Sequence, residues 1–503
     1  MELHLRDLMT PAPLTAEPAD TLAAAADAMR RHDVSSAVVV RDGAVVGILT
    51  ERDLARACAA GAAPQATPVT AWMSPEPVTA APESEIPAAL ERMLDRNVRH
   101  LPVCAGGALV RTVSLRQLVR AASLRRVDPW APGTARGLEN VTVAETRISH
   151  IDATGGRLVY AGHDAVQLAA SRSFEDVWCL LLTGAPPCDP AFTRRVEALR
   201  TPTLPLATLR ALAAAEGGMM SKLEGALAAT GATMGLTPWY ERDEASIEDE
   251  AVRLGSVTPT LVAALWRLGR GLEPVAPDPA LGHAANYLWM LHGERPTPGQ
   301  VRAAERYVIL AAEHGMNAST FTARVIASTG ADVAAALVGA AGALSGPLHG
   351  GAPSLVLDML DDIGTVERAG AWIAAAIASG RRIMGFGHRV YRTEDPRAAC
   401  LRATAEEIGA PRGGLARMVE REALAQLRAA KPDRVLATNV EFWAAVALEA
   451  AGIPRALFTP TFAVARMAGW TAHVLEQVGD NRLIRPSARY VGPAVRPPGA
   501  SAV

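Results

Sequence analysis

The residues from Arg381 to Arg397, with the sequence RRIMGFGHRVYRTEDPR, concentrate side chains that can do chemistry. Five arginines and one histidine fall within these seventeen residues, and two glycines flank Phe386 just before His388. Glycine lets the backbone adopt a positive φ and approach a ligand closely, while guanidinium groups donate paired hydrogen bonds that match carboxylate or phosphate oxygens. Histidine is the usual acid, base or polar donor near neutral pH. The segment therefore predicts a site for a small anionic molecule, with a solvated basic surface as the alternative.

Polar side chains in apolar or glycine-rich surroundings recur further along the chain. His349 lies in the loop sequence GALSGPLHGG, ahead of a predicted helix that begins at about Pro353. Because a helix N-terminus disfavours an imidazolium, we expect this ring to be a neutral, polarising donor. Glu441 and Arg466 lie in helically spaced segments that are otherwise apolar. A charge there is costly to bury unless an opposite charge pairs with it, so both are candidate site residues.

Signatures of several other enzyme classes do not occur in the sequence. It contains no HExxH, no Walker loop and no GxSxG elbow, which removes the usual support for a metalloprotease, a P-loop NTPase or a serine hydrolase. Lone histidines such as His283 and His473 are more often packing residues, and we assign them no role.

The elements that must position the candidate residues are predicted to be helices. Residues 137–164 alternate apolar and polar positions around a GG turn, which predicts a small hairpin. From Ala165 onward nearly every segment has helical spacing broken by glycine and proline. The clearest helical segments are Phe174–Leu182, Pro205–Glu216, Leu223–Ala232, Pro259–Leu268 and Pro298–Glu313. The sequence therefore predicts a mostly α-helical main body with few strands.

The first 124 residues contain two similar units of about sixty residues each. The segment from DLMTPAPLTAEP to LTERDLARA aligns with the segment from AWMSPEPVTAAP to VSLRQLVRA. Each unit is predicted to have an extended lead, an amphipathic helix, a strand, a glycine turn, a second strand and a closing helix, an α/β pattern. Residues 125–136, RRVDPWAPGTAR, are rich in Pro, Gly and Arg without an apolar period, which predicts a linker.

The two units resemble a tandem cystathionine-β-synthase (CBS) domain pair, a module that commonly binds adenine nucleotides in clefts between its repeats. In that family a Thr or Ser, followed three residues later by Asp, contacts phosphate and ribose, and the first repeat has Thr50 and Asp53. A carboxylate can accept hydrogen bonds from both ribose hydroxyls. The second repeat has Ser114 but puts Gln117 in the Asp position and Arg111 where a glycine would precede it. The resemblance implies a nucleotide site at Thr50 and Asp53, with a ligand-free dimerisation module as the alternative.

Length and composition limit the remaining functions. The chain has 503 residues, 50% of them hydrophobic and 20% charged, as in ordinary globular proteins of several domains. A formal net charge of −2 gives no overall attraction to nucleic acid or to an anionic membrane, so anion binding must be local. The five cysteines are scattered without CxxC spacing, and neither a signal peptide nor a membrane-spanning run is apparent. We therefore expect a cytoplasmic protein with no membrane or nucleic-acid partner.

Residues 137 to about 492 resemble the citrate synthase family, particularly its bacterial citrate/2-methylcitrate branch. The matching stretches, in the expected order, are GLENVTVAETRISHID, NASTFTARV, GPLHGGAP, RIMGFGHRVYRTEDPRA, NVEFW, AGWTAHVLEQ and NRLIRPSARYVG. The resemblance implies a helical homodimer in which a small subdomain, here about residues 351–452, closes over oxaloacetate and an acyl-CoA. The chain would then comprise a CBS pair at 1–124, a linker at 125–136 and a two-domain citrate synthase-like body at 137–503.

The resemblance also implies a role for each candidate residue. His349 would hydrogen-bond the thioester carbonyl, His388 would polarise the oxaloacetate ketone, and Glu441 would remove the acyl α-proton. The oxo-acid carboxylates would be held by His314, Arg397, Arg466 and Arg485, the last from the other subunit. A thioester α-proton is weakly acidic, so a carboxylate removes it only where a positioned donor meets the developing enolate oxygen in a dry site. Neither a metal nor a prosthetic cofactor is required, because the coenzyme A thioester is itself a substrate.

One departure from the family pattern concerns the base. The family normally has Asp where this chain has Glu441, one methylene longer, and a Tyr-Ser pair is replaced by Trp443 and Ala444. A group misplaced by roughly 1 Å can slow a reaction about a hundredfold. The leading interpretation is a tricarboxylic acid cycle type acyltransferase that makes citrate from acetyl-CoA, or 2-methylcitrate from propionyl-CoA, with adenine nucleotide as an effector. A citryl-CoA-type lyase and a non-catalytic sensor of nucleotide and oxo-acid are the alternatives.

Overall fold

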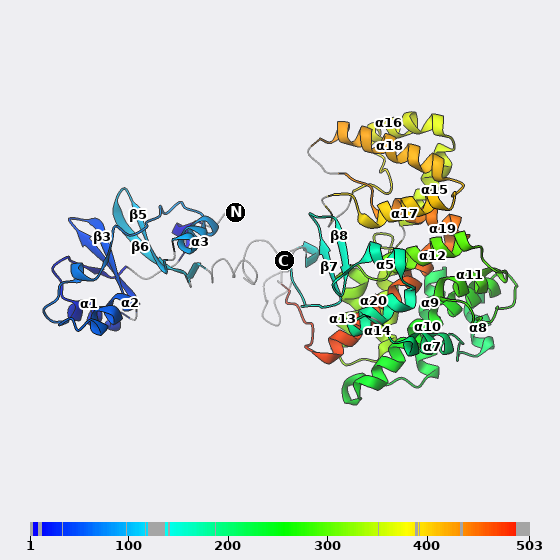
Figure 1. Cartoon of the computed structure of the whole chain (residues 1–503), viewed down its shortest axis with the longest axis horizontal. Helices are drawn as coiled ribbons and strands as arrows, with labels where there is room; N and C mark the ends of the chain where they lie inside the picture. The colour runs from blue at the N-terminus through cyan, green and yellow to red at the C-terminus, as the bar shows by residue number, and fades with distance from the viewer. Residues whose placement is uncertain are drawn as a thin grey trace, which may run out of the picture. The chain divides into compact units, whose positions relative to one another are not determined.

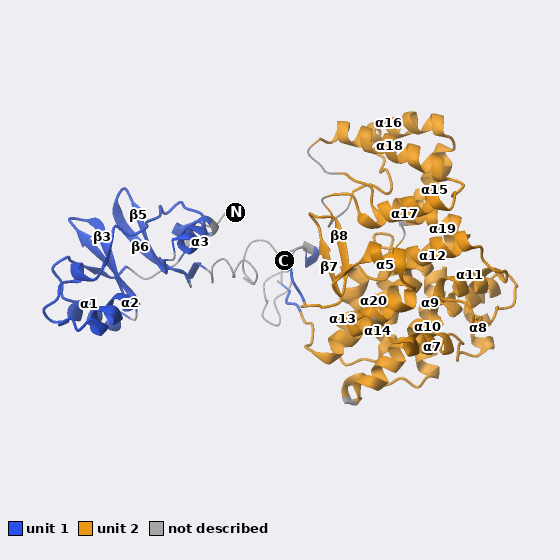
Figure 2. Cartoon of the chain, viewed as in Figure 1, with its two compact units in different colours: residues 1–143, 486–503 blue, residues 144–485 orange. Residues whose placement is uncertain are grey.

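The chain folds into two compact units, one made of residues 1–143 and 486–503 and the other of residues 144–485 (Figure 1, Figure 2). The computed structural model describes residues 4–8, 13–32, 34–96, 98–115, 117–118, 136–138, 141–186, 188–350, 352–387, 391, 393–432 and 436–488. The predicted linker at 125–136 lies outside the described residues apart from Arg136, and His388 lies outside them as well.

The first unit is built around one six-stranded sheet. Its strands run in the order β1-β2-β3-β6-β5, with β4 paired to β3. Two antiparallel hairpins, β2–β3 and β5–β6, carry a register shift at the equivalent position, between Val39 and Val40 in one and between Val103 and Cys104 in the other. The elements are β1 (Thr15–Ala16), α1 (Leu22–Arg31), β2 (Ser36–Arg41), β3 (Ala44–Thr50), α2 (Glu51–Ala59), β4 (Ser74–Pro75), α3 (Ile86–Asp95), β5 (His100–Ala105) and β6 (Ala108–Ser114). Two equivalent hairpins, each preceded by a helix, confirm the predicted α/β repeat.

Each repeat has an apolar core of its own. Leu22, Val39 and Leu49 pack together in the first repeat, and Leu101 packs with its neighbours in the second. Leu5, from the start of the chain, is fully buried in the core of the second repeat. The N-terminal residues are therefore part of the second half of the pair.

The second unit is mostly helical, as predicted. A three-stranded antiparallel sheet, β7 (Ser149–Asp152), β8 (Arg157–Tyr160) and β9 (His163–Asp164), confirms the hairpin expected around the GG turn. The helices that follow are α5 (Ala165–Ser171), α6 (Phe174–Thr183), α7 (Pro190–Ala198), α8 (Leu206–Ala214), α9 (Met219–Thr233), α10 (Glu244–Leu268), α11 (His283–His292), α12 (Pro298–Ala311), α13 (Ala318–Ser328), α14 (Val333–Ser345), α15 (Ala352–Ile363), α16 (Ala369–Ala378), α17 (Pro396–Glu407), α18 (Gly413–Ala430), α19 (Val440–Ala450) and α20 (Phe458–Gly479).

Helix α20 lies in the interior of this unit. It packs against α6, α10, α12, α13 and α14, and almost every residue from Phe458 to Val474 is buried. A helix buried on all sides is expected to be apolar throughout. The buried polar residues Arg466 and His473 on α20 therefore need polar partners, and those partners identify a site.

The prediction that a helix begins at Pro259 was wrong. Helix α10 begins at Glu244, capped by Asp243, whose carboxylate accepts from the N–H of Ser246 at 2.9 Å, and it continues through Pro259 to Leu268. A proline inside a helix costs roughly 3 kcal/mol. This helix carries the cost because its central residues are buried without interruption from Leu254 to Leu265.

The spacing of the five cysteines had not predicted a disulfide. The structure joins Cys179 on α6 to Cys188 in a disulfide, whereas Cys58, Cys104 and Cys400 are free. The turn after α6 brings the two sulfurs together over nine residues, which no spacing rule had indicated. Among the described residues, no helix combines the length and apolarity needed to cross a bilayer.

Candidate active site

Arg466 on α20 carries a buried charge with unused hydrogen-bonding capacity. The residue is 1% exposed, its Nε donates to the carbonyl oxygen of Ala311 at 2.7 Å, and its guanidinium carbon lies 4.8 Å from the Phe462 ring centroid. Its Nη1 has no hydrogen-bond partner among the described residues. Burial lowers the pKa of Arg466, and the carboxylate of Glu313 opposes that change. A buried guanidinium with a spare N–H group is suited to binding an anion.

Glu441 stands in the first turn of α19. Asn439 caps this helix, and its Oδ1 accepts from the N–H of Glu441 at 3.1 Å. Burial raises the pKa of Glu441 to about 7, although the positive charges of Arg397 and Arg466 act in the opposite direction. A carboxyl group with this pKa is about half ionised at pH 7 and binds a proton more strongly than an exposed glutamate, as a general base requires.

Arg397, at the start of α17, is already paired with a carboxylate of this chain. Its Nε and Nη2 donate to the two oxygens of Asp395 at 3.0 and 2.8 Å. Burial lowers the pKa of Arg397, but the adjacent Asp395 outweighs burial and the pKa is raised. Asp395 also accepts from the N–H of Val440 at 3.2 Å, which ties the start of α17 to the start of α19. Asp395 therefore occupies the Nε–Nη2 edge of the guanidinium.

His349, in the loop before α15, is half-buried and hydrogen-bonded to α13. Its Nε2 lies 2.9 Å from Oγ of Ser319, and Trp470 Nε1, which can only donate, reaches the same oxygen at 3.1 Å. Ser319 has a single proton, which it can donate to Oδ1 of Asn317 at 2.7 Å or to Nε2 of His349. With the proton donated to Nε2, His349 carries its own proton on Nδ1 and can donate it to a carbonyl oxygen. Burial, assisted by Arg466, lowers the pKa of His349 to about 4. The ring is therefore neutral at pH 7, in agreement with the prediction.

The two glycines before His388 have the backbone geometry that the sequence predicted. Gly385 and Gly387 have φ angles of 89° and 87°. A Cβ added at Gly385 would lie 2.6 Å from the Cβ of Phe442, so this close approach requires glycine. The N–H of Asn439, the cap of α19, donates to the carbonyl oxygen of Gly385 at 2.9 Å. The segment that leads to His388 is thereby held beside the start of α19.

Two other candidates differ in their surroundings. The ring of His314, which follows α12, is half-buried, with its centroid 5.7 Å from that of Tyr391. Arg485 is exposed, in the extended segment after α20. The described part of this chain records no hydrogen bond or ion pair between Arg485 and the other candidates.

Four of the predicted residues come close together in space. The pKa of Glu441 responds to the charges of Arg397 and Arg466, and the pKa of His349 responds to Arg466. They are supplied by α19, α17, α20 and the loop before α15, which are far apart in the sequence. Two buried cations beside a carboxylate of raised pKa can bind a dianion and remove a proton from a neighbouring molecule.

Comparison with known proteins agrees with this geometry. A model of the citrate synthase C-terminal domain matches residues 137–487. The chain belongs to the citrate synthase family. Members of this family condense an acyl-CoA with oxaloacetate, so the chain is a citrate synthase-like enzyme of the acyltransferase class. A model of the CBS domain matches residues 5–60 and 69–124, so two CBS repeats precede the citrate synthase part.

Relatives within the family carry two kinds of name. A putative citrate synthase 2 from Mycobacterium tuberculosis is 43% identical over 373 residues, covering 72% of this chain and 94% of the relative. The citrate synthase of Haloferax volcanii is 40% identical, covering 71% and 95%. The 2-methylcitrate synthase of Mycobacterium tuberculosis is 39% identical, covering 72% and 91%. Among solved structures, the citrate synthase of Thermotoga maritima is similar with a TM-score of 0.63 and 36% identity, covering 73% of this chain and 98% of that one.

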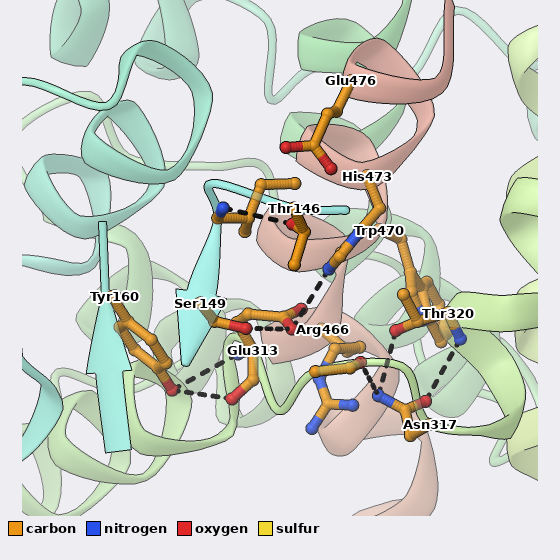
Figure 3. A network of polar contacts seen from close by, with 12 residues as sticks. Thr146, Ser149, Tyr160, Glu313, Asn317, Thr320, Arg466, Trp470, His473 and Glu476 are labelled. Carbon is orange, nitrogen blue, oxygen red and sulfur yellow. Dashed lines mark hydrogen bonds and ion pairs between the residues drawn. The ribbon is translucent and has the colours of Figure 1, made fainter. Parts of the chain in front are cut away.

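A polar network on α20 of this citrate synthase-like enzyme was not predicted from the sequence (Figure 3). His473, to which no role was assigned, is fully buried, with its Nε2 3.1 Å from Oε1 of Glu313. Ser149 donates to the same oxygen at 3.0 Å, and Arg324 donates to Nδ1 of His473 at 2.8 Å. The sequence did contain a signal for this network, because His473 lies seven residues after Arg466 and so occupies the same face of the helix.

In the CBS pair, the predicted nucleotide-binding residues lie at the start of a helix. The N–H and Oγ1 of Thr50 both donate to Oδ2 of Asp53, at 2.9 and 2.7 Å, and Arg56 pairs with the other oxygen. In the second repeat the N–H and Oγ of Ser114 donate to Oε1 of Gln117, at 2.8 and 2.9 Å. Both repeats thus use this side chain to cap a helix. A ribose that binds Asp53 would have to share its carboxylate with these contacts.

Arg111 has a structural role in the second repeat. Its Nη1 donates to the carbonyl oxygens of Leu5 and Arg6 at 3.2 and 3.3 Å and also contacts that of Leu8. At the equivalent position of the first repeat, a side chain on Gly47 would collide with Met73. Arg111 therefore fastens the N-terminal segment to the second repeat.

Proposed function

We propose that this chain condenses an acyl-CoA with oxaloacetate and releases citrate, or an alkyl-citrate, together with free CoA. The proposal rests on a candidate base, Glu441, near a buried cation, Arg466, that has an N–H group free to bind a substrate. Burial raises the pKa of Glu441 to about 7, and Nη1 of Arg466 has no hydrogen-bond partner among the described residues. Bound oxaloacetate would neutralise the buried charge and place its ketone beside the base.

In the proposed reaction, Glu441 removes a proton from the α-carbon of the acyl group. The Nδ1–H of His349 donates to the thioester oxygen while it becomes an enolate oxygen. The α-carbon then forms a carbon–carbon bond to the ketone carbon of oxaloacetate, which His388 would polarise, and the ketone oxygen takes up a proton. Water finally hydrolyses the thioester, and this step releases CoA and a carboxylate.

The proposal includes substrate binding in a cleft that closes. His314, Arg397 and Arg466 would hold the oxo-acid, and Arg485 would reach the site of the other subunit of a cytoplasmic homodimer. Within the predicted small subdomain at about 351–452, α16 packs on α18 and both α15 and α17 pack on α19. These contacts hold the helices of the subdomain together, while α17 and α19 also pack on α12 in the remainder of residues 137–503. In the proposal, the subdomain closes over this remainder as one body. Neither a metal nor a prosthetic group takes part in the proposed steps.

Release of free CoA tests the proposed reaction. Purified full-length chain is mixed with oxaloacetate and either acetyl-CoA or propionyl-CoA, and the new thiol is followed with a thiol reagent. Thiol that appears only when oxaloacetate is present supports the proposal, and its absence with both acyl-CoAs contradicts it. The ratio of the two kcat/KM values identifies the preferred acyl group. Cleavage of citryl-CoA to acetyl-CoA and oxaloacetate, without condensation, would support the lyase instead.

The raised pKa of Glu441 predicts an acid limb in the pH dependence of the rate. Because the base acts as a carboxylate, kcat/KM for the acyl-CoA is expected to fall about tenfold for each pH unit below about 7 and to level off above it. His349, with a pKa of about 4, stays neutral over this range and adds no second limb. Initial rates at constant ionic strength between about pH 5.5 and about pH 9 test this, and a flat profile below pH 7 would contradict it.

We also propose that the CBS pair binds an adenine nucleotide at Thr50 and Asp53. Calorimetry with AMP and ATP should show binding that Asp53→Ala weakens about tenfold or more, because that variant removes the acceptor for the ribose hydroxyls. Gln117→Ala is the matched control, since it removes the equivalent helix cap in the second repeat. Unchanged affinity in Asp53→Ala would defeat the assignment of the site.

Regulation of turnover by nucleotide is the second part of that proposal. If nucleotide alters oxo-acid binding, linkage requires oxaloacetate to alter nucleotide affinity by the same factor. The same titrations repeated with saturating oxaloacetate measure this factor. A factor of one would make the CBS pair a scaffold, whatever its ligand.

A further inference from the structure

Three residues of α20 contact three consecutive residues at the end of α12, and we call this contact the α12 seat. The pairs are Arg466 Nε with Ala311 O at 2.7 Å, Gly469 N with Ala312 O at 3.1 Å, and His473 Nε2 with Glu313 Oε1 at 3.1 Å. Spacings of three and four residues place the α20 members on one face of the helix. The residue that follows the seat is His314, so the seat joins two of the residues proposed to bind the oxo-acid.

Glycine is required in the middle of the α12 seat. A Cβ added at Gly469 would collide with both the carbonyl oxygen of Ala312 and Oε2 of Glu313. The end of α12 therefore comes closer to the backbone of α20 than a residue other than glycine at position 469 would allow. This closeness brings a fully buried carboxylate, that of Glu313, to the helix that carries Arg466.

Hydrogen bonding determines which nitrogen of His473 carries the proton. Arg324 has donors only, and its Nη1 lies 2.8 Å from Nδ1 of His473. Nδ1 must therefore accept, and in the neutral ring the proton sits on Nε2. That proton points to Oε1 of Glu313, where Ser149 donates as well (Figure 3). Oε1 of Glu313 is thus held by two donors.

The other carboxylate oxygen of Glu313 accepts no hydrogen bond from the described residues. Oε2 of Glu313 and Nη1 of Arg466 each lack a hydrogen-bond partner among the described residues. Burial raises the pKa of Glu313, but His473, Arg466 and Ser149 outweigh burial and the pKa is lowered, so the group is an anion at pH 7. Glu313 therefore stabilises the guanidinium by its charge without taking up Nη1.

We infer that His473 and Glu313 are positioning residues for oxo-acid binding, which hold Arg466 and His314 in register and keep Nη1 of Arg466 open to substrate. Without the proton of His473, only Ser149 holds the Glu313 carboxylate, which can then turn more readily and pair with Arg466. That internal ion pair would compete with the substrate. The inference rests on the proposed function, because it takes oxaloacetate as the anion that Arg466 binds.

Two substitutions at position 473 separate the contacts of the histidine. In His473→Asn the side-chain oxygen can take the place of Nδ1 and accept from Arg324, but the shorter side chain does not reach Glu313. In His473→Gln the longer amide can donate to Glu313 in place of Nε2. His283→Gln is the matched control, because His283 is also buried, stacks on Phe174 with centroids 4.3 Å apart, and has no hydrogen-bond partner on either ring nitrogen among the described residues.

Calorimetry with oxaloacetate alone measures the effect without requiring turnover. We expect Kd to rise about tenfold or more in His473→Asn, the change that loss of one hydrogen bond to a charged group produces, and to stay near the wild-type value in His473→Gln and His283→Gln. In the kinetic assay the KM for oxaloacetate should rise in the asparagine variant with little change in kcat. Equal affinities in the asparagine and glutamine variants would overturn the inference.

A less disruptive variant guards against misfolding. Ser149→Ala removes the second donor to Oε1 of Glu313 from the half-buried strand β7 and is expected to raise the Kd for oxaloacetate about threefold. Wild-type affinity in Ser149→Ala, if His473→Asn does not fold, would also overturn the inference. The inference and the proposed function can fail separately. If the wild-type chain binds oxaloacetate and the variants change its Kd as expected, but no acyl-CoA leads to release of CoA, the proposed reaction fails and the positioning role stands.

Discussion

Replacement of Glu441 by glutamine is expected to lower kcat about a thousandfold, within the usual contribution of a positioned general base. The amide has nearly the same shape as the carboxylate but cannot accept the α-proton. The N-cap of α19 remains, because Asn439 bonds the backbone N–H of residue 441 rather than its side chain. Deuterium exchange at the acyl α-carbon, measured with an unreactive oxo-acid analogue bound, should disappear together with turnover.

The control for this variant lies on the same helix. Glu449, near the end of α19, pairs with Arg412 at 2.9 Å in a partly exposed position, and Glu449→Gln removes a charge from α19 while leaving the site intact. Unchanged exchange in Glu441→Gln would exclude Glu441 as the base. Glu441→Asp restores the residue that is usual in the family, and faster turnover of acetyl-CoA by this variant would mean that the longer carboxylate is placed for another acyl group.

Arg466→Lys is expected to raise the KM and the Kd for oxaloacetate by about ten- to a hundredfold, which corresponds to the loss of about 1.5 to 3 kcal/mol for a hydrogen bond to a charged group. A lysine keeps the charge, but it cannot donate to Ala311 and to a substrate in the fixed directions of a guanidinium. The effect should therefore appear in substrate binding with the fold retained. Calorimetry with oxaloacetate and initial-rate kinetics measure it.

Arg455→Lys is a suitable comparison for Arg466→Lys. Arg455 lies just before α20 and pairs with Asp358 at 3.1 Å in a partly exposed position, where exchange of one cation for another has little effect. Comparable KM values for oxaloacetate in the two lysine variants would assign Arg466 to structure alone. Loss of the folded state only in Arg466→Lys, measured by thermal denaturation, would lead to the same assignment.

Much of the fold could be predicted from the sequence because it depends on local periodicity. The α/β repeat, the hairpin at the GG turn and helices α6, α8, α9 and α12 followed from apolar spacing and turn residues, since these patterns decide which face of an element can be buried. The prediction began helix α10 at Pro259, too late in the chain, because a local rule treats proline as a helix boundary. Burial along the whole helix outweighed that rule, and burial depends on neighbours that are distant in the sequence.

The residue types of the candidate site could be predicted from the sequence, but its hydrogen bonds and ion pairs could be predicted only in part. Glu441, Arg466 and His349 stood out because a charge or an imidazole in such surroundings needs a partner. The pairing of Arg397 with Asp395 over two residues was close enough in sequence to have been suspected. The contact between Glu313 and His473 was not, because 160 residues separate the two side chains.

The sequence by itself determined that this protein has a CBS pair followed by a helical citrate synthase-like body, and it named the candidate side chains for its chemistry. Local spacing, the positions of glycines and the order of the motifs are properties of the chain that do not depend on its folding. Only the tertiary structure decided how the distant side chains are paired: His349 to Ser319, and Glu313 to His473, with Nη1 of Arg466 left open among the described residues. The physical reason is that hydrogen bonds and charges act over a few ångströms in space, and only packing of elements such as α12 and α20 brings residues distant in the sequence within that range.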